Sequence, residues 1–547
     1  MRRPDDGMLG PEAAGTKWWT IPRMPAVRAL HALLLVLLGG CASGGTPGLS
    51  RPSPETLPPY SPLRVTSLQD GDAWLRHHLV SNDTEEALAL VDPGRRDLHP
   101  DRLLRALQEA IVLREAGNYV RSNEVLEWAE SEADLRSVRS VSRTAGSFVL
   151  SDRVLSFVPD EGEAAMIPYY RMMNHLSLGD TDAAAVEARR LSALLLGTRD
   201  LGVRQCRQSA MLQYVSAFVF EAAGELDDAL VSLRQADESF LTCPGGRAAG
   251  PPHLGGDLLR LAKRLGFEEL GDSAAAWYPG TEETGASAEQ GQVVLLLERG
   301  FVPHLTDSAI HVPIFEEEIE NLESGDLDGI ASVVGMVTAR LVGTFAERGY
   351  WGRAWNDEPG VQVAQALGGA YILKLAWPGL DGLPKDRTSV ELLVHGDTID
   401  AVRIGDLAEV AVRSLEENQK AMLGRLVTRG VTKYLISREA EKKAEKEGGE
   451  LLGFITARIA NIAANQTERA DTRSWTLLPA DISMVRLSLP AGEHELRVET
   501  VGVDGARARL DDLAPIEVLP GELRIINHRI WTDRPLPEGS ATAADEG

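Results

Sequence analysis

Apolar residues recur at spacings of three and four from about residue 66 to residue 270, and short glycine-containing polar stretches interrupt them. This period is typical of helices that bury one face. The pattern predicts three helical hairpins, at residues 103–130, 166–191 and 205–241, whose turns contain Gly117, Gly179 and Gly224. A further helix is expected at 258–270. We therefore predict an all-α domain over residues 66–288.

The three predicted hairpins resemble tetratricopeptide repeats in one respect. A small residue follows each turn glycine by five positions, at Ser122, Ala184 and Ala229, where two helices must approach closely. The glycines are 62 and 45 residues apart, whereas a regular array repeats about every 34 residues. The sequence thus predicts a tetratricopeptide-like helical-hairpin solenoid with irregular repeats.

In such a solenoid the first helix of each hairpin lines a groove. Aromatic residues and methionine are enriched at binding surfaces, and the first helices carry several of them. The candidate partner groove consists of Tyr169, Met173, Tyr214, Phe218 and Glu221. Packing in the core is the alternative for each of these residues taken singly.

Strand patterns begin after a loop-rich stretch at residues 243–289. Alternating or continuous apolar runs predict strands at 293–297, 309–314, 371–377 and 390–394, and helical periods predict helices at 407–446 and 451–464. Two β-hairpins are expected at 484–498 and 516–531, around Pro490-Ala491-Gly492 and Pro520-Gly521. The whole chain is therefore predicted to be an α+β multidomain protein, with a C-terminal α+β domain at 289–532 and a disordered tail at 533–547.

The N-terminal region has the layout of a bacterial lipoprotein signal. Arg28 precedes an apolar run that ends in Gly39, Gly40 and Cys41, and the run is shorter than the roughly 20 residues that span a bilayer. We predict a signal peptide at 1–40, with Met24 as an alternative start, lipidation of Cys41, and a flexible linker at 41–65. An ordinary cleaved secretory signal and a membrane-spanning or core helix are the alternatives.

Residue 42 is alanine. In lipoproteins of bacteria with two membranes, aspartate at this place retains the protein at the inner membrane. By this resemblance we expect a lipid-anchored protein at the outer membrane, facing the periplasm. Cys206 and Cys243 remain once Cys41 is lipidated, and they open and close the third hairpin. An oxidising compartment favours a disulfide between them over two free thiols.

Composition narrows the function further. The 547 residues carry a net charge of −25, with a pI near 5.0, and this acidic balance disfavours nucleic acid as a partner. The sequence contains no HExxH, paired CxxC, P-loop or GxSxG pattern. We therefore expect no enzymatic activity, no metal and no cofactor.

Asp471, Arg473 and Trp475 are the most conspicuous polar group in the second half. Residues two apart in an extended segment point to the same side, so this trio could bind a ligand. A structural salt bridge, with Trp475 packed against it, is the interpretation that we favour.

Three stretches resemble a bacterial envelope lipoprotein family of unknown function. They are PYYRMMNHLSLGD at 168–180 with VEARR at 186–190, GQVVL at 291–295 extending to Gly300 and Pro303, and RADTRSW at 469–475 continuing to 478–480. The resemblance implies an envelope lipoprotein with a repeat-like helical half and implies no activity.

Taken together, the sequence predicts a membrane-anchored, non-enzymatic scaffold or assembly factor of the bacterial envelope. Its partner would be another envelope protein, whose identity the sequence does not give. A periplasmic lipoprotein that binds glycan or peptidoglycan is the alternative, because the turn at 489–494 resembles those of small surface β domains.

Overall fold

The computed structural model describes residues 68–91, 101–143, 156–197, 206–281, 283–285, 287, 289–324, 326–348, 370–382, 389–448, 469–501 and 507–531. All of these belong to one compact unit, residues 57–547. The predicted signal peptide, Cys41, the predicted linker, the helix expected at 451–464 and the predicted tail at 533–547 lie outside the described residues. Among the described helices, none combines the length and the apolar character needed to cross a bilayer.

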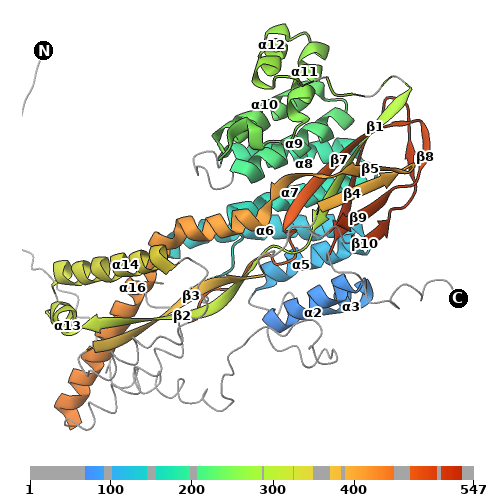
Figure 1. The fold of residues 1–547 in the computed structure, drawn as a ribbon. Coiled ribbons are helices and arrows are strands. Elements are labelled where there is room, and N and C mark those ends of the chain that lie inside the picture. Colours follow the sequence, from blue (N-terminus) through green and yellow to red (C-terminus); the bar gives the residue numbers. More distant parts are fainter. Residues whose placement is uncertain are drawn as a thin grey trace, which may run out of the picture. The chain divides into compact units, whose positions relative to one another are not determined.

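The N-terminal part is a succession of helical hairpins (Figure 1). Its helices are α2 (Leu68–Val80), α3 (Thr84–Leu90), α5 (Arg102–Glu115), α6 (Tyr119–Arg143), α7 (Glu161–Ser177), α8 (Thr181–Gly197), α9 (Cys206–Ala222), α10 (Leu226–Thr242), α11 (Leu254–Arg264) and α12 (Glu268–Trp277). From α5 to α12 each helix contacts the next one in the chain. The three predicted hairpins are confirmed as α5–α6, α7–α8 and α9–α10.

The turn glycines explain where these hairpins reverse. Gly117, Gly179 and Gly224 have φ angles of 75°, 76° and 79°, a left-handed conformation that glycine adopts without steric cost and that ends a helix. Gly266 does the same at φ 80°. The single helix predicted at 258–270 is therefore wrong, because Gly266 divides that stretch into α11 and α12.

The second part is built around strand β1 (Gln290–Arg299), which lies between β12 (Leu523–Ile530) and β7 (Asp481–Pro490). β1 runs parallel to β12 and antiparallel to β7, and β6 (Val402–Asp406) completes this four-stranded sheet. Alternate residues of β1 enter two different hydrophobic cores: Val294 and Leu296 pack with the helices, whereas Val293, Leu295 and Leu297 pack with other strands. Burial of both faces explains the continuous apolar run of this strand.

A second sheet covers the face of the first sheet that points away from the helices. Its order is β10-β9-β4-β5, and β11 pairs with β8 beside it. The strands are β4 (Ser389–Val394), β5 (Asp397–Asp400), β8 (Gly492–His494), β9 (Arg497–Val501), β10 (Arg507–Asp512) and β11 (Ile516–Val518).

The two predicted C-terminal β-hairpins are wrong in their pairing. β7 pairs with β1 and β6, whereas β9 pairs with β4 and β10. Likewise β11 pairs with β8, and β12 pairs with β1. The chain therefore crosses between sheets at Pro490–Gly492 and at Pro520–Gly521. The pairing could not be predicted because alternation identifies a strand without identifying its neighbour.

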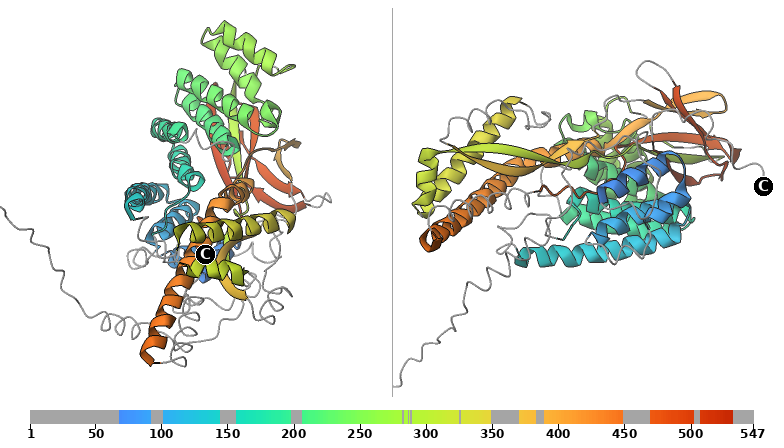
Figure 2. Two further views of the ribbon diagram at one scale, coloured as in Figure 1. Left: turned by 90° about the vertical axis from the view of Figure 1, so that its left-hand side faces the viewer. Right: turned by 90° about the horizontal axis from the view of Figure 1, so that it is seen from below.

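A third core belongs to a ribbon of two long strands and three helices, visible from two directions in Figure 2. β2 (His304–Phe315) pairs antiparallel with β3 (Ala370–Asp381) along its whole length. α13 (Glu316–Glu323), α14 (Leu327–Arg348) and α16 (Leu407–Gly448) contribute buried apolar side chains to the same core. The strands predicted at 309–314, 371–377 and 390–394 and the helix predicted at 407–446 are confirmed, as is the α+β architecture.

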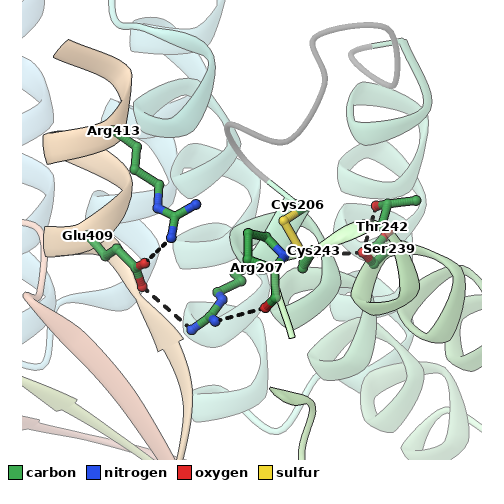
Figure 3. Close-up of a disulfide and its surroundings, with 8 residues drawn as sticks. Cys206, Arg207, Ser239, Thr242, Cys243, Glu409 and Arg413 are labelled. Atoms are coloured by element: carbon green, nitrogen blue, oxygen red, sulfur yellow. Dashed lines mark hydrogen bonds and ion pairs between the residues drawn. A yellow bond between two sulfur atoms is a disulfide. The ribbon is translucent and has the colours of Figure 1, made fainter. Parts of the chain in front are cut away.

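Cys206 and Cys243 are joined by a disulfide at the base of the α9–α10 hairpin (Figure 3). Arg207 beside it donates to the carbonyl oxygen of Pro244 at 3.1 Å and lies 3.5 Å from Glu409 of α16. Arg413 donates to the other carboxylate oxygen of Glu409 at 2.5 Å. The stapled hairpin base is thus tied by charge to the first turns of α16.

We predict that non-reducing peptide mapping of the purified chain will recover Cys206 and Cys243 in one linked peptide. The bond closes a loop with a sequence separation of 37 residues, for which loss of chain entropy in the unfolded state corresponds to roughly 3–4 kcal/mol. Cys206→Ser with Cys243→Ser should lower the free energy of unfolding by up to that amount. Two thiols that alkylate without prior reduction would contradict the prediction.

Candidate functional site

The predicted partner groove is buried in the structure. Tyr169, Met173, Tyr214 and Phe218 are all 0–1% exposed. The reason is that α7 and α9 pack against β12, and α9 also packs against β6, of the same chain. The expectation of an open groove along the first helices is therefore wrong, because the protein's own sheet occupies that face.

Tyr169 and its neighbour Tyr170 instead bind a buried carboxylate on β1. Their hydroxyls donate to the two oxygens of Glu298, at 2.9 and 3.1 Å. Asn527 and Arg529 of β12 also donate to Glu298, at 2.8 and 3.3 Å. Burial and the charge of Glu298 hold the pKa of both tyrosines well above the usual range, so both hydroxyls keep the protons that they donate.

The polar cluster continues from Glu298 into α5. Arg114 donates to Asn174 of α7 at 2.6 Å and to Asn527 of β12 at 2.5 Å. Glu115 follows Arg114 in α5, and its carboxyl group accepts a hydrogen bond from the indole nitrogen of Trp531 at 3.2 Å. Burial raises the pKa of Glu115. Three elements far apart in the sequence are thus joined by one hydrogen-bonded network.

A second buried carboxylate holds the other end of the sheet. Asp257 of α11 is fully buried and accepts hydrogen bonds from Tyr214 at 2.7 Å, from Thr284 at 2.5 Å, and from Arg486 of β7. Glu221, the remaining residue of the predicted groove, forms an ion pair with Arg260 at 2.5 and 2.8 Å. Tyr214 therefore serves the packing of helices against the sheet, whereas Glu221 joins α9 to α11.

Asp471 and Arg473 form the salt bridge that their spacing favours, with N–O distances of 2.7 and 2.6 Å. Arg473 also donates to Asp101 at the start of α5, at 2.9 Å. Trp475 is fully buried, and its ring centroid lies 5.8 Å from that of Tyr170. The trio thus connects a loop of the α+β part to two helical hairpins.

These contacts bring the three family-like stretches together. The stretch at 168–180 supplies Tyr170, the stretch at 291–303 supplies Glu298, and the stretch at 469–480 supplies Trp475. Arg529 spans two of them, since it donates to the carbonyl oxygens of Gly300 and Leu477 at 2.5 and 3.0 Å. The most conspicuous sequence motifs therefore build the junction between helices and sheet.

A cavity of about 260 Å³ lies beside this junction. One face of α16 lines it, with residues at helical spacings of three and four from Leu407 to Met422. The start of β2, the end of β3 and the start of α7 form other parts of its wall. Most of the lining is apolar, so the cavity is built to hold an apolar group.

Two carboxyl groups lie in the wall at the start of α7. Asp160 accepts from the backbone nitrogen of Glu163 at 2.7 Å, and Glu163 accepts from the backbone nitrogens of Asp160 at 3.1 Å and of Trp475 at 2.5 Å. This is a capping box, which the pattern D-x-x-E could have indicated. No local sequence pattern indicates the cavity, because its walls come from six separate segments of the chain.

The electrostatics of this pair are unusual. Burial and the neighbouring charge of Asp160 raise the pKa of Glu163 to about 8. Asp160 is exposed and Glu163 is half-buried. Because water screens an exposed charge, we rest the argument on Glu163.

No group of three or more His, Cys, Asp or Glu residues is placed to hold a metal ion in the part of the chain that the structure describes. The cavity offers apolar walls and hydrogen-bond acceptors. Such a site can bind a small molecule that has an apolar body and a donor group.

No protein family model matches this chain, and no curated protein matches it. Among solved structures it is similar to TPR-like repeats described as a kinesin light chain of Podosopora anserina, with 13% identity and a TM-score of 0.27 over 39% of this chain and 97% of that one. A variant of the same protein matches at 15% identity and a TM-score of 0.26, over 38% and 93%. The tetratricopeptide-like description of this chain therefore rests on its own helical hairpins and not on these similarities.

We predict that Glu298→Ala will lower the free energy of unfolding by roughly 3–5 kcal/mol, because it leaves the guanidinium of Arg529 buried without its carboxylate partner. Tyr169→Phe, which removes one of the four donors, should lower it by about 1 kcal/mol. Glu439→Ala, at an exposed position on α16, is the matched control and should change it little. Chemical denaturation measures all three. Equal effects of Glu298→Ala and Tyr169→Phe would contradict the proposed role of the buried carboxylate.

We also predict a loss of stability with rising pH that depends on Glu163. Because the pKa of Glu163 is raised, the folded chain holds a proton that the unfolded chain releases, so stability falls as the pH rises from about 4.5 toward about 8. Glu163→Gln keeps the capping geometry and should remove part of that fall. Thermal unfolding at pH 5, 6.5 and 8 measures it. A variant whose midpoint follows the same pH curve as the wild type would refute the prediction.

Proposed function

We propose that this protein is a non-enzymatic scaffold or assembly factor, lipid-anchored at the outer membrane of a bacterial envelope and facing the periplasm. Cys41 would carry the anchor, and the acidic folded part would hold another envelope protein. The observation that supports a binding role most directly is the exposed face of α14. Since the protein's own sheet covers the inner face of the hairpins, a partner needs a different surface.

Between residues 331 and 343 the exposed face of α14 carries no charged residue, and the exposed Asp328 lies one turn before it. This face consists of Ala331, Ser332, Gly335, Met336, Ala339 and Gly343. Charged residues make up 25% of the chain, and a helix face in contact with water ordinarily carries them. The one charged residue between 329 and 343 is Arg340. Its guanidinium group donates to the carboxylate of Glu318 and, at 2.9 Å, to the carbonyl oxygen of Pro313.

The opposite face of α14 is already used. Val333, Val337 and Leu341 are buried in the core shared with the β2–β3 ribbon and α16. Its exposed face carries mostly small side chains around Met336, which is 45% exposed. Small residues permit close approach of another helix, and an uncharged surface is typical of the centre of an interface. This face therefore supports a protein partner.

The glycan-binding alternative has less in its favour. The turn that suggested it contains His494, which is buried and bonded to His395 at 3.0 Å and to the carbonyl oxygen of Pro490 at 2.8 Å. The side chain of His494 thus joins the β4–β5 turn, at His395, to the end of β7, at Pro490.

Site-specific photo-crosslinking in intact envelopes tests the scaffold proposal. A photoreactive residue in place of Met336 should give one discrete adduct with an envelope protein, and the same residue in place of Glu268, exposed on α12, is the control. Met336→Glu, which puts a charge on this face, should abolish an adduct formed from Ala339. Equal crosslinking from both helices, or none from α14, would refute the proposal.

The anchor has its own test. Cys41→Ala should leave the chain without acyl groups and shift it from the membrane fraction to the soluble fraction, as fractionation and mass spectrometry would show. A Cys41→Ala chain that still carries acyl groups and stays with membranes would overturn the lipoprotein assignment.

A further inference from the structure

The cavity beside α16 has two chemically different regions. Most of its wall is apolar and includes Val302, Leu305, Leu380, Leu407 and Ala411, although Ser414, Asn418 and Ser474 add polar groups. At the start of α7 the wall is polar and includes Asp160 and Glu163. Since Asp160 is exposed, this polar region reaches solvent. An occupant would therefore place an apolar body among the apolar side chains of the wall and a polar head near the start of α7.

The polar groups of this wall accept hydrogen bonds. In the described part of the chain neither Asp160 nor Glu163 forms an ion pair, although the chain contains many arginine–carboxylate pairs elsewhere. Gln208 is 3% exposed, and its side-chain nitrogen donates to the carbonyl oxygen of Gly162 at 2.9 Å. Its side-chain oxygen has no hydrogen-bond partner. A buried acceptor without a donor is costly, and an incoming donor would satisfy it.

We propose that this cavity binds a small organic ammonium ion, with its apolar body against α16 and its charged head at Asp160 and Glu163. This assignment adds a ligand to the molecule and does not depend on the scaffold proposal. The cation would supply the countercharge that the two carboxyl groups lack within the described structure. The apolar walls would desolvate its hydrocarbon part, which contributes to affinity.

The shape and composition of the site exclude other classes of occupant. A divalent cation such as calcium takes six to eight oxygen ligands, whereas most of this wall is hydrocarbon. The seven residues of α16 in this wall include two polar ones, Ser414 and Asn418, too few to partner all the hydroxyls of a sugar. A carboxylate or phosphate would be repelled by the charge of Asp160 and, once the proton has left it, by that of Glu163.

The volume of the cavity is sufficient for a small organic molecule. At about 30 Å³ for a water-sized group, a cavity of about 260 Å³ holds roughly eight non-hydrogen atoms. A primary amine with six carbons matches this size. We therefore choose hexylamine as the probe, with 1-hexanol as the neutral analogue and hexanoate as the anionic analogue.

Isothermal titration calorimetry on the purified full chain tests the assignment. Hexylamine should bind saturably at one site, at least about tenfold more tightly than 1-hexanol, and hexanoate should bind more weakly still. Binding should also release protons from the acidic pair, so the measured heat should change between buffers of different ionisation enthalpy at pH 7. Affinity should rise with pH between 6 and 8, by at most about tenfold per pH unit for each proton released.

Substitutions locate the site. Asp160→Asn and Glu163→Gln keep the helix cap and together should weaken hexylamine binding by at least about tenfold. Glu161→Gln is the matched control, because Glu161 lies in the same helical turn, is exposed, and is not part of the wall; it should leave the affinity unchanged. Ala411→Leu and, separately, Ser414→Leu narrow the cavity and should abolish binding while circular dichroism shows a folded chain.

Several results would overturn the assignment. Equal affinity for hexylamine and 1-hexanol would show an apolar pocket without charge recognition. Equal weakening by Glu161→Gln and by the Asp160/Glu163 pair would show attraction to the acidic surface in general. Unchanged binding in both folded cavity-narrowing variants would show that hexylamine binds outside the cavity. A lack of saturable hexylamine binding would refute the proposal.

Discussion

The rest of this structure depends on the hydrogen bonds that surround the buried carboxylate of Glu298. A charge of this kind is stable away from water only when donors surround it, and here they come from α7 and β12. Satisfying it therefore requires that the hairpins, the central strand and the C-terminal strand meet in one arrangement. Asp257 imposes a similar requirement at the other end of the sheet, through Tyr214 and Arg486.

This requirement determines which surfaces are left for other molecules. The inner face of the hairpins is covered by the protein's own sheet, so it cannot work as the open groove of a repeat protein. The β2–β3 ribbon and its helices have a core of their own, which leaves one face of α14 uncovered. The cavity lies where this ribbon and α16 begin, next to the Trp475 loop. Both candidate binding surfaces are thus consequences of how the helices and the sheet are joined.

Local features of the fold could be predicted from the sequence, and pairings could not. The hairpin turns were predictable because a left-handed glycine ends a helix through local sterics alone. At Gly266 the apolar period continues across the turn, so the pattern there predicts one helix where the structure has two. Strand positions were predictable from alternation. The partners of β7 and β12 were not, because a strand has the same pattern whichever neighbour it pairs with. The aromatic residues of α7 and α9 suit an interface and a core equally, and the sheet made them core.

The sequence by itself determined three helical hairpins, the strands that have a clear apolar or alternating run, the long helix α16 and the proximity of Cys206 to Cys243, since each follows from periodicity or from a turn of a few residues. It also determined that Asp471 and Arg473 point to one side. It did not indicate β5, β6 or β10. Only the tertiary structure decided that Tyr169, Glu298 and Trp475 meet, that the groove is filled, and that Asp160 and Glu163 face a cavity. Those outcomes depend on contacts between residues more than 100 positions apart, and no local pattern records which distant groups will satisfy a buried charge.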